Sequence, residues 1–400
     1  MRLLYFHQHF ATPAGSSGTR SYEFARELVR RGHSVTVVCG AQALSGLNLP
    51  FDPVRGWARG KVDGIDVISL PLPYSNRDSL LRRAFVFARF ALRSAVLAVK
   101  EDADLVFATS TPISAAVPGL AAKWFRGTPF VFEVRDLWPD LPRALGVTSP
   151  PVLALMTALE RLAYRSADAV IGLAPGIVAA VRARSGPRTE VELIPNGCDL
   201  DAFSPALRPT SRPAEFVAGF TGAHGPANGL DALLDVAREL KRRGDRRVKI
   251  VLIGDGREKD RLAGVAREEG LDNCQFLPPV PKHALGAVTA SFGCGLMVLK
   301  DVPEFRDGTS PNKFFDYLAA GLPVVNNYPG WLAGLVEQSG CGVVVPPGDP
   351  VAFADALQHL AADPAACASM GAAARRLAEE RFARGDLATR FCAVLERAAL

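Results

Sequence analysis

The sequence predicts an α/β protein that contains two doubly wound, Rossmann-like domains. Short β-branched apolar runs alternate with amphipathic helical segments along the chain, which is typical of parallel sheets. This alternation restarts at Phe216–Thr221, after a proline-rich linker at Ser204–Pro213. The length of 400 residues is about two to three times that of a typical domain.

The composition narrows the class of protein. It is 48% hydrophobic and 22% charged, as expected of a globular chain with a sizeable core. The net charge of +5 is spread along the chain and is too weak to indicate nucleic-acid binding. Seven scattered cysteines form no C-x-x-C pair, so they predict neither a disulfide framework nor a metal site. With no signal-peptide pattern and no apolar run of membrane-spanning length, we expect a cytoplasmic protein.

A glycine-rich loop follows the first predicted strand, Leu3–Phe6. It contains Gly15, Ser17 and Gly18 and leads through a helix to a second strand at Val35–Cys39. The loop has neither the G-x-G-x-x-G pattern nor a Walker lysine, so it does not indicate a nicotinamide or P-loop site. Glycine still allows close approach to a ligand, so Ser17 and Gly18 are candidate binding residues. A plain tight turn is the alternative.

Charged residues follow the predicted strand Pro129–Val134. Arg135 and Asp136 come directly after it, at the carboxyl edge of the sheet, where α/β proteins bind their ligands. Both are therefore candidate catalytic residues. An aspartate that only caps the loop is the alternative.

The stretch from residue 79 to residue 93 predicts a helix with an unusual surface. Arg82, Arg89 and Arg93 form one stripe of this helix, and several aromatic residues lie elsewhere around it. It suits either an ordinary helix packed on the sheet or an interfacial helix on an anionic membrane. The second interpretation matters only for a lipid-borne substrate.

The segment Ser310–Val325 predicts a helix start, a short helix, a stop and a buried strand. Ser310 suits the N-cap and Pro311 the first helical position, while Gly321 suits a left-handed helix end.

Lys313, in the first turn of this helix, opposes the helix dipole. A bound phosphate would remove that conflict. Asn312 and Asp316 are expected on the same helix face, where a carboxylate could accept hydrogen bonds from ribose hydroxyls. A surface helix with an incidental lysine is the alternative.

Two further glycine-containing turns follow strands in the second half of the chain. The first contains Gly222 and His224, and the second contains Gly254 and Gly256. Both turns are candidate parts of a nucleotide pocket.

Several short segments, in their order and spacing, resemble the family 4 glycosyltransferases of the GT-B fold. They are Gly15–Gly18, residues 31–35, 167–170 and 194–199, Gly254–Gly256, Ser310–Val325 and residues 342–348. The Gly-Ala-His-Gly turn and the Ser-Pro-Asn-Lys-Phe-Phe-Asp segment are closest to the WbuB-type subgroup. That subgroup comprises N-acetyl-L-fucosamine transferases and related enzymes of O-antigen and capsule synthesis.

The resemblance implies two Rossmann-like domains that face each other across a cleft. We expect an acceptor-binding domain at 1–205, a nucleotide-sugar-binding domain at 206–375, and a C-terminal helix at 376–400 that packs back on the first domain. The donor would be a UDP-sugar and the acceptor a sugar linked to polyprenyl diphosphate at the inner face of the cytoplasmic membrane. Transfer would retain the anomeric configuration and require neither metal nor cofactor.

The resemblance also implies residue roles. Asp316 stands where the family holds the ribose, Asn312 and Lys313 lie beside the diphosphate, and Gly254–Gly256 lines the nucleotide pocket. Ser310 and Pro311 are further candidate binding residues. Lys313 would stabilise the leaving diphosphate, and Asp136 would orient the acceptor.

The sequence departs from the family pattern in three ways. Gly308 replaces the first motif glutamate, for which Glu304 is a possible substitute. Ala223 and Asn228 replace the usual basic clamp on the diphosphate, which gives more weight to Lys313, His224 and either Arg257 or Lys259. Arg135 replaces the usual histidine. His7 or His9 could approach that place from the first strand, although a lone surface histidine is the favoured interpretation for each.

Three alternatives remain open. A transferase with a soluble acceptor is the closest. A UDP-sugar 2-epimerase would require histidines and carboxylates around the sugar, whereas the chain has only six histidines. A degenerate, non-catalytic GT-B subunit would be consistent with the three departures.

Overall fold

The computed structural model describes all residues except 42–44, 74–77, 145, 188 and 210–214. The described chain divides into two compact units. Unit 1 contains residues 1–195, 308–310 and 385–400, and unit 2 contains residues 196–307 and 311–384. Residues 210–213 of the predicted linker lie outside the described residues. No described helix is both long enough and apolar enough to cross a membrane.

Unit 1 is built on a nine-stranded sheet with the order β3-β4-β5-β2-β1-β6-β7-β8-β9. Its strands are β1 (Arg2–Phe6), β2 (Ser34–Gly40), β3 (Phe51–Asp52), β4 (Trp57–Val62), β5 (Ile65–Leu70), β6 (Leu105–Thr109), β7 (Phe130–Val134), β8 (Ala169–Gly172) and β9 (Glu190–Leu193). Its helices are α1 (Arg20–Arg30), α2 (Leu80–Lys100), the 3-10 helix η1 (Ile113–Ala116), α3 (Val117–Arg126), α4 (Asp140–Ala144), α5 (Pro150–Ser166), α6 (Pro175–Arg184) and α15 (Arg384–Ala398).

The strand order of unit 1 changes direction between β1 and β6. From β1 the chain continues to β2 and β5 on one side, and it then crosses to β6 and proceeds to β9 on the other side. In the sheet order from β5 to β9 every pair is parallel, whereas the β3–β4 and β4–β5 pairs are antiparallel. This doubly wound order creates a crevice outside the carboxyl ends of β1 and β6, where ligands bind in such folds.

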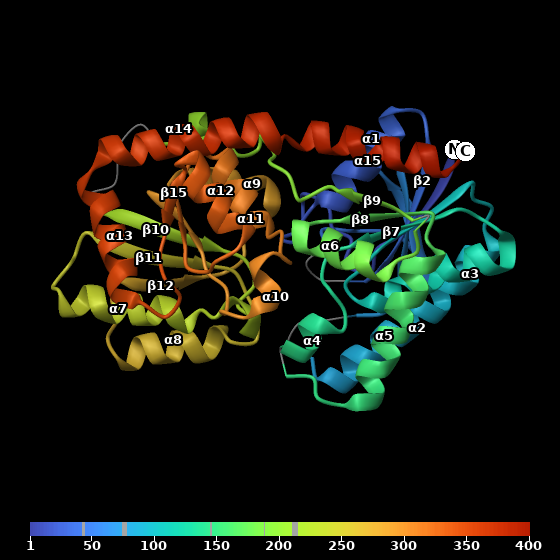
Figure 1. Cartoon of the computed structure of the whole chain (residues 1–400), viewed down its shortest axis with the longest axis horizontal. Helices are drawn as coiled ribbons and strands as arrows, with labels where there is room; N and C mark the ends of the chain where they lie inside the picture. Colours follow the sequence, from blue (N-terminus) through green and yellow to red (C-terminus); the bar gives the residue numbers. More distant parts are fainter. Residues whose placement is uncertain (42–44, 74–77, 145, 188, 210–214) are drawn as a thin grey trace. The chain divides into compact units, whose positions relative to one another are not determined.

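Helices cover both sides of the unit 1 sheet. α2, α3 and α5 lie on one side, and α1 and α15 lie on the other (Figure 1). On the α1 side, Phe391 of α15 packs against Phe24 and Phe107, with ring centroids 4.6 and 5.0 Å apart. The α2 side is less completely buried, because large apolar side chains of α2, α3 and α5 remain exposed.

A buried ion pair links the start of α1 to β7. The guanidinium of Arg20 lies 2.8 Å from the Glu133 carboxylate, and both side chains are almost fully buried. Arg20 also donates to the backbone carbonyls of Ile194 and Pro195, and Glu133 accepts from Thr109. These bonds compensate for the loss of hydration of both charges and fix the start of α1, directly after the Gly15–Gly18 loop.

Unit 2 is built on a six-stranded, entirely parallel sheet with the order β12-β11-β10-β13-β14-β15. Its strands are β10 (Phe216–Thr221), β11 (Val248–Ile253), β12 (Cys274–Leu277), β13 (Cys294–Met297), β14 (Val324–Asn326) and β15 (Gly342–Val344). Its helices are α7 (Asp231–Arg242), α8 (Lys259–Glu268), α9 (Lys282–Ala290), α10 (Pro303–Arg306), α11 (Asn312–Ala319), α12 (Trp331–Ser339), α13 (Pro350–Ala362) and α14 (Pro364–Arg381), with 3-10 turns η2 (Pro205–Leu207) and η3 (Pro226–Asn228).

The order of the unit 2 sheet matches the dinucleotide-binding pattern, with its switch point between β10 and β13. α7 and α8 lie on one side of the sheet, and α9, α11 and α12 lie on the other (Figure 1). The predicted pair of doubly wound domains is therefore confirmed. The switch point places the loops after β10 and β13 at the expected ligand edge.

The units divide at different residues from those given by the sequence. Unit 1 ends at Pro195 rather than near 205, because Cys198 pairs with Ala383 and its N–H donates to Phe382 within unit 2. α14 runs to Arg381 inside unit 2, so the C-terminal part of unit 1 begins at Gly385 rather than near 376.

α11 begins one residue later than predicted. Asn312 is its first residue, Pro311 occupies the N-cap position without a side-chain capping bond, and Ser310 lies outside the helix. The predicted Ser310 cap is therefore wrong. At the other end, Gly321 has a φ of +63°, which confirms the predicted left-handed helix end.

Candidate active site

The ammonium group of Lys313 lies at the ligand edge of unit 2. Its Nζ lies 3.7 Å from the centroid of the Phe220 ring and 3.0 Å from Oδ1 of Asn228. Lys313 is partly buried as a residue, but the aromatic ring displaces water from its ammonium. This loss of hydration lowers the pKa of Lys313 to about 7. A cation held in a dry setting interacts strongly with an anion that enters it.

Two glycines allow the loops after β10 and β11 to pack closely beside Lys313. A Cβ atom at Gly222 would lie 3.1 Å from Cε of Lys313, and one at Gly254 would lie only 1.8 Å from the carbonyl oxygen of Gly222. The loops after β10 and β11 therefore pack backbone to backbone, which only glycine permits at Gly254. The N–H of His224 also donates to the carbonyl of Asp255, over 2.9 Å.

The His224 ring is fully buried beside these glycines. Its centroid lies 6.0 Å from the centroid of the Phe220 ring and 5.9 Å from that of the Phe276 ring. Neither ring nitrogen has a hydrogen-bond partner within the described part of the chain. Burial, followed by the charges of Lys259 and Lys313, lowers the pKa of His224 to about 4. A neutral imidazole with unsatisfied nitrogens is costly to bury, so the site favours a ligand that bonds to it.

The ammonium of Lys259 is already bonded to the backbone. Its Nζ donates to the carbonyls of Gly254 and Leu277, at 2.8 and 2.7 Å. It therefore holds the Gly254–Gly256 loop against β12. Arg257, the other suggested substitute for the clamp, is exposed.

Asp316 points to a different partner from Lys313. Its two carboxylate oxygens accept hydrogen bonds from Nζ of Lys282, and the Asp316 side chain is almost fully buried. Lys282 also lies over the Phe203 ring, 4.3 Å from its centroid, and its burial lowers its pKa. Asn312, Lys313 and Asp316 all lie in α11, as expected, but the carboxylate is already paired with Lys282. Its role at the ribose stays a prediction.

Unit 1 carries a second polar cluster at the carboxyl ends of β1, β6 and β7. Asp136 accepts a hydrogen bond from the Thr111 hydroxyl over 2.8 Å, and burial raises the pKa of this carboxyl group. The backbone N–H of Arg135 donates to the Ser110 hydroxyl. Its guanidinium approaches Nε2 of His7 at 3.3 Å. The predicted neighbours Arg135 and Asp136 are thus held at the switch point of the unit 1 sheet.

The interpretation of His7 and His9 as lone surface residues is wrong. His7 is 3% exposed, its Nδ1 has no partner within the described residues, and burial keeps its pKa well below the usual range. His9 is half-buried, with its ring 6.2 Å from Phe87 of α2. The segment after β1 therefore brings an imidazole to the guanidinium of Arg135, the residue that replaces the usual histidine of the family.

Two other features lie outside these clusters. A cavity of about 290 Å³ in unit 2 is lined by Phe216 and Val217, at the opposite end of β10 from Gly222, so it is not part of the site. Among the described residues, no group of three or more His, Cys, Asp or Glu is placed to hold a metal ion.

Comparisons with known proteins decide the family. Residues 15–197 match a "Glycosyl transferase 4-like domain", and residues 215–363 match "Glycosyl transferases group 1". Together these matches cover most of the chain. This protein is a glycosyltransferase.

Relatives and solved structures agree with this assignment. The putative colanic acid biosynthesis glycosyl transferase WcaI of Escherichia coli is 24% identical, over 80% of this chain and 82% of its own. A D-inositol 3-phosphate glycosyltransferase of Nocardioides is 27% identical, over 87% and 78%. The structure of HepE from Anabaena, solved with UDP and glucose, has a TM-score of 0.70, 20% identity and 99% coverage of both chains. The fold of this glycosyltransferase is GT-B.

Several predicted site residues of the glycosyltransferase meet in space, and others do not. Gly222, His224, Gly254, Gly256 and Lys313 lie close together in unit 2. Ser17 and Gly18 lie half-buried in the loop before α1 of unit 1. Ser310, Pro311 and Asn312 are half-buried before and at the start of α11, and Glu304 is half-buried in α10. The binding role of each remains a prediction.

Two residues of the glycosyltransferase that bond to predicted site residues were not predicted to do so from the sequence. Asn228 stands where the family has a basic residue, yet here its side chain positions Lys313 and also donates to the Ala223 carbonyl. The second is Lys282, whose partner Asp316 lies 34 residues away in the sequence. It is the first residue of α9, so the conflict with the helix dipole that drew attention to Lys313 could also have drawn attention to Lys282.

Proposed function

We propose that this glycosyltransferase transfers a sugar from a UDP-sugar to a sugar acceptor linked to polyprenyl diphosphate, with retention of configuration and without a metal ion. The observation that carries this proposal is the setting of Lys313, whose poorly hydrated ammonium lies against the Phe220 ring and beside Gly222. The resemblance to the WbuB-type subgroup favours N-acetyl-L-fucosamine as the transferred sugar, in O-antigen, capsule or exopolysaccharide synthesis.

Lys313 supplies the charge that the leaving group requires. The departing UDP gains negative charge as its bond to the sugar breaks, and donors that are already in place stabilise it most. The N–H groups of the first turn of α11 add to this field, because helix N-termini attract anions. Removing one such donor costs about 3–4 kcal/mol in the barrier. The positive charge of Lys313 would stabilise the departing diphosphate, a task for which other enzymes use a divalent metal ion.

Retention in a single step, without a covalent carboxylate intermediate, requires attack on the face from which UDP departs. The acceptor oxygen forms the new bond to the sugar carbon as the bond to the phosphate oxygen breaks, and that phosphate oxygen takes the hydroxyl proton. This route needs no carboxylate pair at the separation found in glycosidases. Asp136, held by Thr111, would orient the acceptor hydroxyl or stabilise positive charge on the sugar carbon.

Similar proteins support the donor and the setting. The HepE structure contains UDP and glucose, and WcaI is described as a colanic acid biosynthesis enzyme. Transfer to a lipid-linked acceptor would take place at the inner face of the cytoplasmic membrane. The 79–93 stretch is the segment for which the sequence predicts contact with that membrane surface.

A soluble acceptor is the second candidate. The similarity to a D-inositol 3-phosphate glycosyltransferase favours it, since that name describes a small phosphorylated acceptor. The guanidinium of Arg135 beside His7 could hold such a phosphate. An epimerase and a non-catalytic subunit remain less favoured alternatives, which incubation with UDP-N-acetylglucosamine alone and nucleotide binding would detect.

Nucleotide binding is the decisive test. Calorimetry of UDP, GDP, ADP and TDP without added metal should show selective binding of UDP, lost in Lys313→Ala. Lys241→Ala is the matched control, because Lys241 is an exposed lysine of unit 2 that bonds only to backbone carbonyls in the loop after α8. Absence of binding to any of the four nucleotides would overturn the donor assignment and favour a non-catalytic subunit.

A further inference from the structure

The solvent side of α2 carries an apolar stripe. Leu81, Phe85, Leu92 and Val96 are 85%, 61%, 67% and 53% exposed. Their spacings of four, seven and four residues place all four on one narrow face of the helix. Isolated exposed apolar residues are common on proteins, but a row along about four turns of one helix marks an interaction surface.

A basic stripe runs beside the apolar one. Arg82, Arg89 and Lys100 are exposed and recur at spacings of seven and eleven residues, so they share one side of α2. Arg89 lies over the Phe85 ring, and Arg82 has Asp78 at 3.6 Å just before the helix. α2 itself contains four arginines, one lysine and no acidic residue.

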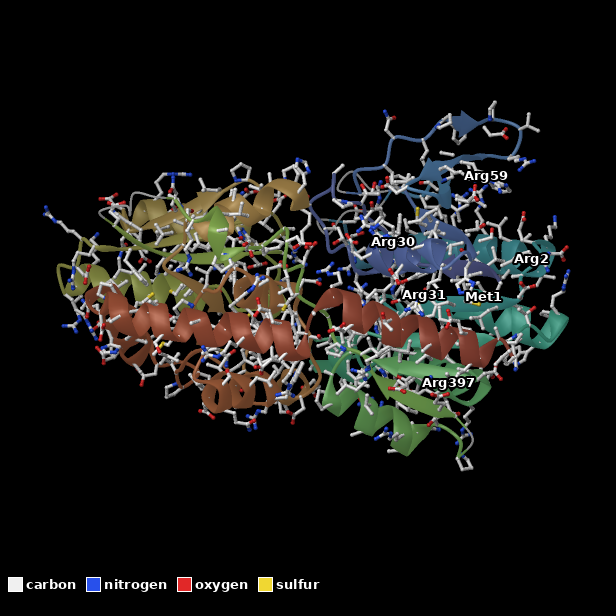
Figure 2. The ribbon with its side chains drawn as sticks, turned by 90° about the horizontal axis from the view of Figure 1, so that it is seen from above. Met1, Arg2, Arg30, Arg31, Arg59 and Arg397 are labelled. Carbon is white, nitrogen blue, oxygen red and sulfur yellow. The ribbon has the colours of Figure 1, made fainter. Side chains whose placement is uncertain are left out.

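The α1 and α15 side of unit 1 has a different charge pattern. Figure 2 looks onto this side, where Arg30, Arg31 and Arg397 are labelled. Arg31 pairs with Glu27 and Glu396, and Arg397 pairs with Glu190. Basic residues are therefore balanced by acids on that side, whereas α2 provides no acidic partner of its own.

α3 and α5 extend the apolar surface. Both helices lie on the same side of the sheet as α2, and α3 packs against both α2 and α5 (Figure 1). Trp124 and Phe125 of α3 are 55% and 75% exposed, and Leu155 of α5 is 69% exposed. We call this set of exposed apolar and basic residues on α2, α3 and α5 the α2 surface.

The α2 surface reaches the edge of the sheet that carries Asp136. A helix of 21 residues is about 31 Å long, whereas a five-residue strand is about 17 Å long. A crossover helix starts at the carboxyl edge of its sheet, so Leu81 and Phe85 lie at that edge. Phe87 of α2 faces His9 there, with ring centroids 6.2 Å apart.

We infer that unit 1 docks on an anionic lipid bilayer through the α2 surface. The apolar stripe would enter the boundary of the acyl chains while Arg82, Arg89 and Lys100 contact anionic headgroups. A second copy of the chain fits less well, because self-association would bring the basic stripe against itself. Docking through the α2 surface would bring unit 1 to a lipid-linked acceptor, and this part of the inference rests on the proposed function.

Vesicle sedimentation with the full chain tests the docking. The wild-type chain should bind vesicles of phosphatidylglycerol and phosphatidylcholine at least tenfold more tightly than pure phosphatidylcholine vesicles. Leu81→Asp/Phe85→Asp and Arg82→Glu/Arg89→Glu should each reduce that binding at least tenfold. Val351→Asp and Arg376→Glu, at exposed positions of unit 2, are the matched controls and should bind as the wild type does.

Two outcomes would overturn the inference. One is wild-type binding that is equal for charged and neutral vesicles or unaffected by both double variants. The other is a dimer in light scattering that Leu81→Asp/Phe85→Asp dissociates, since this would make the surface a contact between copies. UDP affinity should be unchanged in every variant. Vesicle binding needs no nucleotide, so its failure is distinguishable from failure of the donor assignment.

Discussion

The ammonium nitrogen of Lys282 lies 2.7 and 2.6 Å from the two carboxylate oxygens of Asp316. Both side chains are at least 90% buried, so this is an internal ion pair rather than a surface contact. A ribose hydroxyl that bonds to Asp316 would have to share its oxygens with Lys282. The pair therefore sets both the stability of unit 2 around α11 and the availability of the carboxylate.

Breaking this pair should destabilise the protein. Lys282→Met leaves the Asp316 charge buried without a partner, which costs about 3–5 kcal/mol in the free energy of unfolding. The double variant Lys282→Met/Asp316→Leu should recover most of this loss, as measured by urea denaturation. UDP calorimetry on the double variant then tests the ribose role, and an unchanged affinity would count against it.

Lys313→Ala should lower turnover at least a hundredfold. The loss follows from removing about 3–4 kcal/mol of stabilisation from the departing UDP. The melting temperature should not fall, because the ammonium is held in a poorly hydrated place and its removal relieves that cost. Initial rates with the donor and thermal unfolding provide the two measurements. Near-normal turnover in a folded variant would refute the assignment.

UDP binding should depend on pH through Lys313. Burial lowers the pKa of Lys313 to about 7, so above this pH the empty site holds mainly a neutral amine. Binding of a diphosphate then requires proton uptake, and the affinity should fall up to tenfold per pH unit between about 7 and 9. Calorimetry in buffers of different ionisation enthalpy measures this uptake. It should disappear in Lys313→Met, and a pH-independent affinity in the wild type would contradict the prediction.

The same lowered pKa predicts the opposite trend for the stability of the empty protein. Between about 7 and the usual value of 10.5, the unfolded chain holds more protons at Lys313 than the folded chain does. The contribution of this residue to the free energy of unfolding therefore rises with pH across that window. Urea denaturation of the wild type and Lys313→Met at pH 7 and pH 9 isolates it. A difference between the two that is independent of pH would contradict it.

Asp136→Asn should impair acceptor use and leave donor binding intact. The substitution keeps the size of the side chain but removes the charge that would orient the acceptor hydroxyl or stabilise the sugar carbon. We expect kcat to fall at least tenfold, with an unchanged dissociation constant for UDP in calorimetry. Thr111→Val is a milder companion, since it removes the hydrogen bond that positions the carboxylate. Loss of UDP binding in Asp136→Asn would show a different role for this residue.

Local patterns in the sequence predict the fold class and indicate most of the candidate donor-side residues. Short β-branched apolar runs located the strands, because the strands of a parallel sheet are buried on both faces and are therefore apolar along their length. Lys313 stood out because a cation in the first turn of a helix conflicts with local electrostatics. Gly222 and Gly254 followed from the turns that end β10 and β11.

Contacts between side chains that are distant in the sequence became evident in the tertiary structure. Asp316 and Lys282 are 34 residues apart, and His7 and Arg135 are 128 residues apart. Their contacts depend on strand order and on how each helix crosses the sheet, which local patterns do not specify. The end of unit 1 at Pro195 likewise depends on the pairing of Cys198 with the distant residue Ala383. Local propensity determines elements, whereas packing between distant elements determines the chemistry that they share.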